Sequence, residues 1–255
     1  MPAPGPAEPK RRLRLGDPLS IVLIVVIVVA VVVAGIIAAE LYARNTADKK
    51  VAEAAQCVAQ DNVTASFSVM PPFLWQHING HYTNITVSTA GNQIKSAKGM
   101  KAVVSINDVD LNGDANSKGT IGALDATITW TATGIQQTVQ DSIPVVGSFL
   151  GNVTTKPSDG TISLDGTFGS IVAKPQVANN KLTLQVVSLS GLGFTLPSES
   201  VQPALDGFSD KLANDLPLGI HADSVQVTDS GVVAHFSTRN AKIPVANVDP
   251  CFAGL

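Results

Sequence analysis

Charged side chains are scarce in this chain: Lys, Arg, Asp and Glu make up 15% of its 255 residues, against about a quarter in a typical soluble domain. The shortage is most extreme from Leu19 to Ala39, where no side chain is charged and only Ser20 is polar. A surface helix of a soluble domain needs a polar side. This segment is therefore excluded from that role.

Sequence signatures of catalysis are also lacking. The Gly-x-Ser-x-Gly nucleophile elbow, the Walker phosphate loop and the dinucleotide-binding fingerprint are all absent. The Asp-Ser-Gly triplet at residues 229–231 resembles that of aspartic proteases, whose carboxylates work as a pair, but it has no second copy and suits a hairpin turn. We therefore predict that the chain is not an enzyme. A hydrolase stays an alternative that would need a catalytic constellation the sequence does not offer.

No metal site or other cofactor is predicted. His77 and His81 have helical spacing, but Gly80 lies between them and no acidic residue or cysteine is near enough to complete a metal site. We interpret both histidines as surface or turn residues.

The chain has only two cysteines, Cys57 and Cys251, and both follow the apolar segment. In an oxidising compartment such a pair is more often a disulfide than two free thiols, which are the alternative. A disulfide would tie the start of the following domain to the C-terminus. Neither cysteine fits a lipid-attachment motif.

The apolar segment predicts a transmembrane helix. Its 21 residues span about 30 Å at about 1.5 Å per residue, the thickness of the hydrocarbon core of a bilayer. Four basic side chains between residues 10 and 14 precede it, and such a flank stays in the cytoplasm. We predict a single-pass cell-membrane protein with its main domain on the periplasmic side. A cleaved signal peptide is the alternative, although the run exceeds the roughly 7 to 15 residues of a signal core.

Four regions follow from this interpretation. Residues 1–17 form a disordered, basic, proline-rich cytoplasmic tail, and residues 18–41 form the anchor. Residues 42–60 form a helical stem, because small apolar side chains recur there at three- and four-residue spacing. Residues 61–255 form one extracytoplasmic domain.

The charge of the exported part excludes some partners. The first 17 residues hold four basic and two acidic side chains, which leaves 13 basic and 18 acidic ones beyond them. This net negative charge argues against nucleic acid and against electrostatic capture of anionic lipid. Any bound lipid would be held mainly through its acyl chains.

Period-two alternation dominates the chain after residue 61 and predicts strands. The expected strands cover residues 64–70, 84–88, 101–111 with a bulge, 125–132, 161–168, 171–174, 181–189, 224–228 and 232–237. Helical spacing interrupts them at about residues 134–143 and 200–216. Val104, Ile106 and Val109 are expected to point inward. The fold class is therefore α+β, with a large, mainly antiparallel sheet packed on two or three helices.

The stretch from Ser68 to Val87 is the most informative one outside the anchor. A predicted strand ends there at Pro71-Pro72, three bulky apolar residues follow at positions 73–75, and Gly80 and Tyr82 lead into the next strand. These side chains either plug the end of a sheet or frame the mouth of an apolar cavity.

This stretch resembles the LmeA-like phospholipid-binding proteins of actinobacterial cell envelopes. The residues that match the family motif are Pro72, Phe73, Leu74, Gly80 and Tyr82. Segments 192–197 and 225–232 resemble the closing segments of the family, whereas residues 75–77 depart from its pattern and the cysteine pair is not part of the resemblance.

The resemblance implies an extracytoplasmic phospholipid-binding domain, linked in better-known members to lipoglycan maturation. It also implies a strongly curved sheet around an elongated apolar cavity, similar to tubular lipid-binding proteins. Candidate lining residues, chosen for apolar bulk near element ends, are Phe73, Leu74, Trp75, Trp130, Phe194 and Phe208. The expected partners are the membrane and a phospholipid. The alternative is an adaptor or scaffold with a filled core that binds an envelope protein.

Overall fold

The computed structural model describes residues 18–142, 150–167, 169–191, 194–196, 216–245 and 250–252. It divides the chain into two compact units, residues 1–43 and 44–255. The predicted helix at residues 200–216 and the side chains of Phe194 and Phe208 lie outside what the structure describes.

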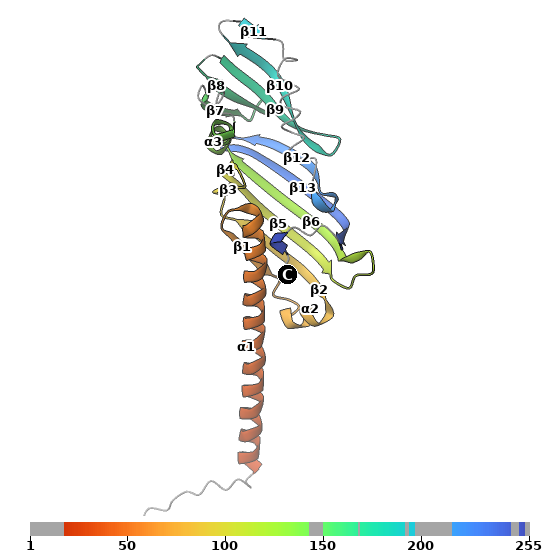
Figure 1. Cartoon of the computed structure of the whole chain (residues 1–255). Coiled ribbons are helices and arrows are strands. Elements are labelled where there is room, and N and C mark those ends of the chain that lie inside the picture. Colours follow the sequence, from red (N-terminus) through yellow and green to blue (C-terminus); the bar gives the residue numbers. More distant parts are fainter. Residues whose placement is uncertain are drawn as a thin grey trace, which may run out of the picture. The chain divides into compact units, whose positions relative to one another are not determined.

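Helix α1 runs without interruption from Pro18 to Ala59 (Figure 1). The apolar segment and the residues after it, up to Ala59, are therefore parts of one helix. The large apolar side chains from Leu19 to Leu41 are 44–74% exposed, so the described part of the chain does not bury them. By length and composition α1 can cross a membrane, and its last sixteen residues belong to the second unit.

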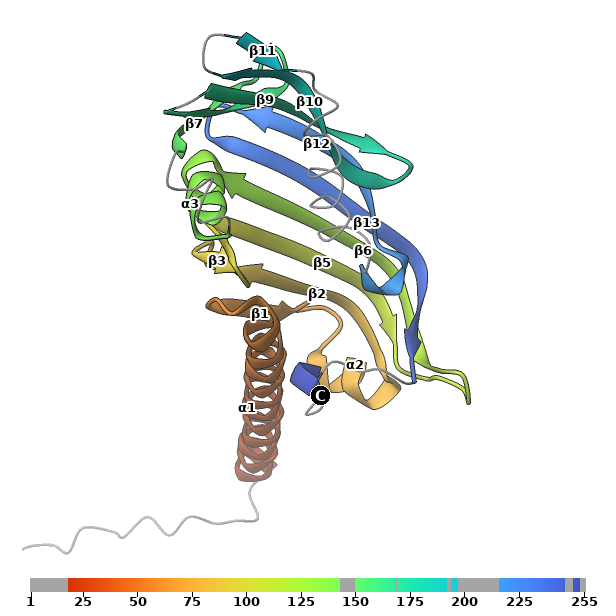
Figure 2. The same cartoon turned by 45° about the horizontal axis from the view of Figure 1, so that its top comes forward.

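A six-stranded antiparallel sheet in the second unit combines its first long strands with its last two (Figure 2). Its strand order is β1-β2-β5-β6-β13-β12. The strands are β1 (Val63–Phe67), β2 (His81–Thr89), β5 (Met100–Asp110), β6 (Ser117–Thr131), β13 (Gly231–Pro244) and β12 (His221–Thr228). A small hairpin of β3 (Gln93–Ile94) and β4 (Ala97–Lys98) joins β2 to β5.

A five-stranded antiparallel sheet follows, in the order β11-β10-β9-β8-β7. Its strands are β7 (Leu150–Lys156), β8 (Thr161–Gly166), β9 (Gly169–Ala178), β10 (Lys181–Gly191) and β11 (Phe194–Leu196). The predicted large antiparallel architecture is confirmed, but its strands are divided between two sheets. Apolar side chains join the sheets, because Val177 and Leu182 pack against the buried cluster of Ala222, Ala234 and Phe236.

Two short helices border the six-stranded sheet. Helix α3 (Ala132–Ser142) follows β6 directly and confirms the helix predicted near residues 134–143. The Thr131 hydroxyl accepts a hydrogen bond from the Gly134 N–H at 3.0 Å and so satisfies a free donor at the start of this helix. Helix α2 (Phe73–Asn79) was not predicted. Single 3₁₀ turns, η2 (Pro217–Gly219) and η3 (Pro250–Phe252), lie in the C-terminal part.

The register of the six-stranded sheet separates apolar from polar side chains. Directly paired residues on four strands place a continuous set of apolar side chains on one side, which we call the apolar face. It comprises Ile85, Val87, Ala102, Val104, Ile106, Leu124, Ala126, Ile128, Trp130, Val232, Ala234 and Phe236. The opposite face is rich in Thr, Ser and Asn, so the sheet is amphipathic across its width.

The regular cross-strand pairing of this sheet is interrupted at one residue on each strand from β2 to β13. These residues are neighbours across the sheet: Thr83, Asp108, Gly122 and Asn240. Asp108 and Asn240 have φ angles of 53° and 51°, and a Cβ on Gly122 would lie 2.8 Å from the Asp108 Cβ. The bulge predicted in the strand at residues 101–111 is not found, because β5 keeps the same register on both sides of Asp108. The interruption there is a bend shared by four strands, with one residue out of the regular pairing on each strand.

The bend shifts the alternation by one residue. Buried side chains therefore recur three residues apart across it, as for Ile121 and Leu124 on β6 and for Thr238 and Ala241 on β13. Figure 2 shows the long strands curving through this region. As a result the apolar side of the sheet continues past the bend to Tyr82 and Val109, both buried.

Candidate functional site

The apolar face brings side chains of one chemical character together from four strands. On β6 this face and its continuation past the bend extend from Ile121 to Trp130, ten residues whose nine steps span about 30 Å at about 3.4 Å per step. Side chains of α3 lie at one end of the face and side chains of α2 lie at the other. The candidate site is thus an elongated apolar surface, and packed side chains of α3 and α2 form its two ends.

The α3 end is a packed cluster that includes Trp130. Ile135 of α3, Val153 of β7, Ile162 of β8 and Val232 of β13 are buried together, and Trp130 packs against them. The indole N–H of Trp130 donates a hydrogen bond of 2.8 Å to the Lys98 carbonyl, which fixes the ring at the edge of the cluster.

The α2 end is an aromatic cluster. Phe73 of α2, Phe67 of β1 and Tyr82 of β2 are all buried, with ring centroids 5.1 to 6.0 Å apart. Phe67 pairs across the strands with Ile85 of the apolar face, so the cluster is continuous with that face. Burial raises the pKa of Tyr82, whose hydroxyl lies 2.8 Å from His77 Nδ1.

Local sequence explains why α2 is short. Pro72 precedes its first residue, and a proline cannot supply an N–H to a helix. Gly80 ends it in the left-handed conformation, with φ 64°, where an L side chain would be strained. His77 therefore lies on the helix while His81 lies on β2, so the two histidines do not share a helical face.

Gln76 is the residue that fastens α2 to the sheet, and sequence reasoning missed it. Its side chain is almost fully buried. Its amide donates hydrogen bonds to the carbonyls of Ser68 and Pro71, and its Oε1 accepts one of 3.0 Å from the Thr83 N–H. Its position three residues before Asn79-Gly80 gives no periodic signal, because a single polar residue in a short apolar stretch is expected to be exposed.

The structure separates the three bulky residues that the sequence grouped as one site. Phe73 is 4% exposed and Leu74 is half-buried, whereas Trp75 is 64% exposed on the outer side of α2. Trp130 lies at the far end of the face from Phe73. The structure thus brings the rings of Phe73 and Tyr82 together. Contact of each candidate residue with lipid stays a prediction.

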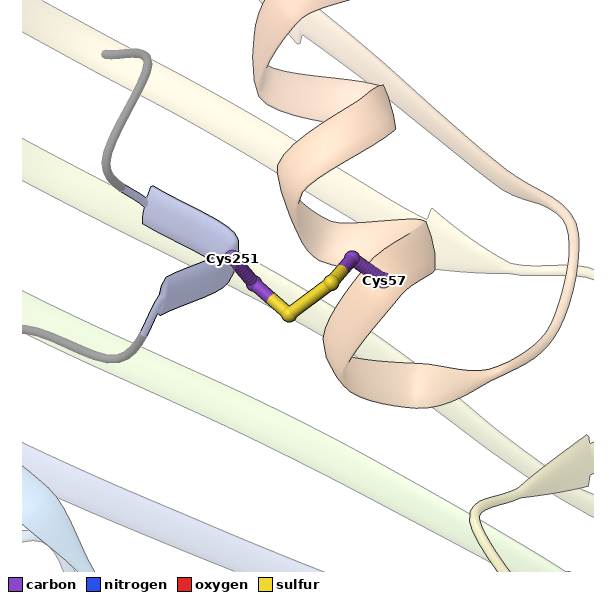
Figure 3. Close-up of a disulfide and its surroundings, with 2 residues drawn as sticks. All are labelled: Cys57 and Cys251. Carbon is purple, nitrogen blue, oxygen red and sulfur yellow. A yellow bond between two sulfur atoms is a disulfide. The ribbon is translucent and has the colours of Figure 1, made fainter.

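The stem of α1 is joined to the domain by a covalent bond and by polar contacts. Cys57 and Cys251 form a disulfide with their Cα atoms 5.6 Å apart, which links the last turns of α1 to η3 (Figure 3). The predicted pairing is confirmed. Earlier in the stem, Arg44 donates a hydrogen bond of 2.8 Å to the Ser68 carbonyl, and the Asp48 carboxylate accepts one of 3.0 Å from the Phe67 N–H.

Asp61 organises the turn that follows the stem. Its carboxylate accepts hydrogen bonds of 2.8 to 3.0 Å from the backbone N–H groups of Asn62, Gly91 and Asn92 and from the Asn92 side chain. Burial opposes ionisation of this carboxylate, but the hydrogen bonds from Asn92, Gly91 and Asn62 outweigh it and lower its pKa.

Two hollows on the described surface are open to solvent. One, of about 480 Å³, lies beside the disulfide and is lined by residues such as Gln60, Asp61 and Asn92. The other, of about 340 Å³, lies between β9 and β12. Neither contains a candidate lipid-lining residue. Among the described residues, no group of three His, Cys, Asp or Glu side chains is placed to hold a metal ion.

Comparison with known proteins links these features to a family. The LmeA-like phospholipid-binding family matches residues 36–237, a range that includes the α2 motif and most of both sheets. Two relatives are 52% identical over 253 residues, 99% of this chain and 72% of each relative: Uncharacterized protein Mb0489c of Mycobacterium bovis and Uncharacterized protein Rv0479c of Mycobacterium tuberculosis. No solved structure matches the chain.

Proposed function

The chain belongs to the LmeA-like phospholipid-binding family, and from this premise we propose a membrane-anchored, extracytoplasmic, non-enzymatic protein that holds phospholipid acyl chains against its apolar face. The observation that carries the proposal is the continuous apolar side of the six-stranded sheet, which spans four strands and about 30 Å of β6. An acyl chain needs a surface of this character, since burial of each CH₂ stabilises the complex by about 0.8 kcal/mol.

The length of the face suits a phospholipid. Each leaflet contributes about half of the roughly 30 Å hydrocarbon core, so an acyl chain extends about 15 Å. A face about 30 Å long therefore accommodates extended acyl chains with room to shift along the strands. The net negative charge beyond residue 17 supports recognition through the chains rather than through an anionic head group.

The anchor restricts what such a lipid binder does. With α1 retained, the domain works within reach of one membrane, where it extracts, presents or senses phospholipid in support of envelope lipid or lipoglycan assembly. The basic residues before α1 support placement of the domain outside the cytoplasm. Release from the anchor by cleavage would instead permit free transport.

Lipid analysis of the full chain tests the proposal. The protein is purified from its membrane in a detergent that carries no phospholipid, and native mass spectrometry records the bound mass. We expect a phospholipid that stays with the protein through purification and exchanges with vesicle lipid. A chain that carries none and takes up none contradicts the proposal, and a single co-purifying envelope protein would then favour the adaptor.

A further inference from the structure

The outer side of α2 and the loop before it carry an exposed apolar patch that the packing of the domain does not use. Val69, Met70, Trp75 and Ile78 are 68%, 74%, 64% and 79% exposed, and we call them the α2 patch. The same helix buries Phe73 and Gln76 on its inner side. The helix thus has one side that packs on the sheet and another that faces outward with large apolar groups.

The position of the patch along the chain places it near the membrane. The Ser68 carbonyl, next to Val69, accepts a hydrogen bond from Arg44, and Arg44 is only five residues beyond Ala39, the end of the apolar segment. Five residues reach at most about 18 Å, whatever the orientation of the domain. The patch is therefore tethered within reach of the lipid head groups.

The surrounding sequence suits a lipid interface. From Asn62 to Ile94 the chain contains no Asp, Glu, Lys or Arg, so entry of α2 into the interface brings no fixed charge into a medium of low polarity. Trp is enriched at membrane interfaces because its ring is apolar and its N–H is polar. The exposed indole of Trp75 on the outer side of α2 has both properties.

We propose that the α2 patch inserts into the interfacial layer of the leaflet that faces the domain. Insertion brings the aromatic end of the apolar face, at Phe73 and Tyr82, to the membrane surface, where a phospholipid enters the face without crossing water. The inference rests on the proposed function for this entry route, but contact between the patch and the membrane is a separate claim with its own measurement.

The two tryptophans of the chain make the two claims separable. Trp75 lies on the patch and Trp130 at the far end of the apolar face. The full chain is reconstituted into vesicles of phosphatidylcholine brominated near the head group, and Trp fluorescence is compared between wild type and Trp75→Phe, which retains Trp130 alone. The difference reports Trp75, because its exposed side chain can be replaced without disturbing the core.

We expect the Trp75 signal to be strongly quenched by shallow bromine and its emission to be blue-shifted relative to an indole in water. Met70→Asp combined with Ile78→Asp should remove most of that quenching. The control Val187→Asp, at an exposed apolar side chain of β10, should leave it unchanged.

A Trp75 signal that is unquenched and has the emission of an indole in water overturns the inference, whatever Trp130 does. Quenching of Trp130 by phosphatidylcholine brominated along its chains reports lipid on the apolar face. Quenched Trp75 with unquenched Trp130 therefore supports membrane insertion and counts against the lipid-binding face. The reverse pattern supports lipid binding without insertion of the patch.

Discussion

The rings of Phe67 and Phe73 meet edge to face with their centroids 5.1 Å apart, which joins α2 to the first strand of the six-stranded sheet. Phe67 pairs with Ile85 of the apolar face, and Phe73 lies at the start of α2, in the stretch whose sequence resembles the family motif. This contact is the structural link between the motif and the face. Removing the Phe73 ring and measuring stability therefore tests the structural role of the motif independently of any lipid contact.

We predict that Phe73→Ala lowers the free energy of unfolding by about 3–5 kcal/mol, because it leaves a cavity among buried rings. Urea denaturation of the full chain in detergent measures it. The control Trp75→Ala, two residues away on the exposed side of α2, should change stability by no more than about 0.5 kcal/mol. Equal effects of the two substitutions would contradict the buried and exposed sides assigned to α2.

Gln76→Ala should destabilise the protein by about 1–3 kcal/mol, because it removes the hydrogen-bond partner of the Thr83 N–H and of the Pro71 carbonyl. Hydrogen exchange should also become faster at the Thr83 amide. Gln137→Ala, at an exposed glutamine of α3, is the matched control and should have little effect. An unchanged Thr83 amide in Gln76→Ala would refute the proposed fastening role.

The lowered pKa of Asp61 should make the stability of the protein depend on pH. Its folded pKa lies below the ordinary value of 3.8, so the carboxylate stabilises the fold above that pH and this contribution is lost as pH falls through the folded pKa. Asp61→Asn should therefore be less stable than wild type at neutral pH, and the difference should shrink below pH 3.8. Thermal unfolding at several pH values measures it. Asp141→Asn, at an exposed aspartate of α3, is the matched control for loss of a surface carboxylate.

The disulfide should contribute up to about 5 kcal/mol, because Cys57 and Cys251 are 194 residues apart and the crosslink restricts a long loop in the unfolded chain. We expect Cys57→Ser combined with Cys251→Ser to unfold at lower denaturant concentration than wild type. Reductant should shift the wild-type midpoint toward that of the variant and leave the variant unchanged. A wild-type midpoint that does not respond to full reduction would contradict this.

Sequence periodicity predicted most of the strands, because one side of each strand is apolar. It failed where the backbone leaves that period: β13 continues to Pro244, beyond the predicted end at residue 237, since the bend at Asn240 shifts the buried positions. The division of the strands into two sheets could not be predicted from the sequence either. Alternation indicates which side of a strand is buried, but not which edges pair.

The candidate site was predicted in part. The motif at residues 72–82 and the disulfide were found from residue types and their order. The helical form of residues 73–79 was missed, because Gly80 counted against a helix when in fact it ends one. Gln76 was missed because its role depends on backbone groups of the loop and of β2, which no sequence pattern reveals.

The most direct test of the lipid-binding face compares two adjacent valines of β5. Val104 lies on the apolar face, paired with Ala126 and Val87, whereas Val103 lies on the opposite face, paired with Thr127 and Ser88. Phospholipid per protein is measured for Val104→Trp and Val103→Trp after confirming that both variants unfold cooperatively. We predict that Val104→Trp loses most of the bound phospholipid and that Val103→Trp retains it. A folded Val104→Trp protein with the wild-type lipid content would contradict the account.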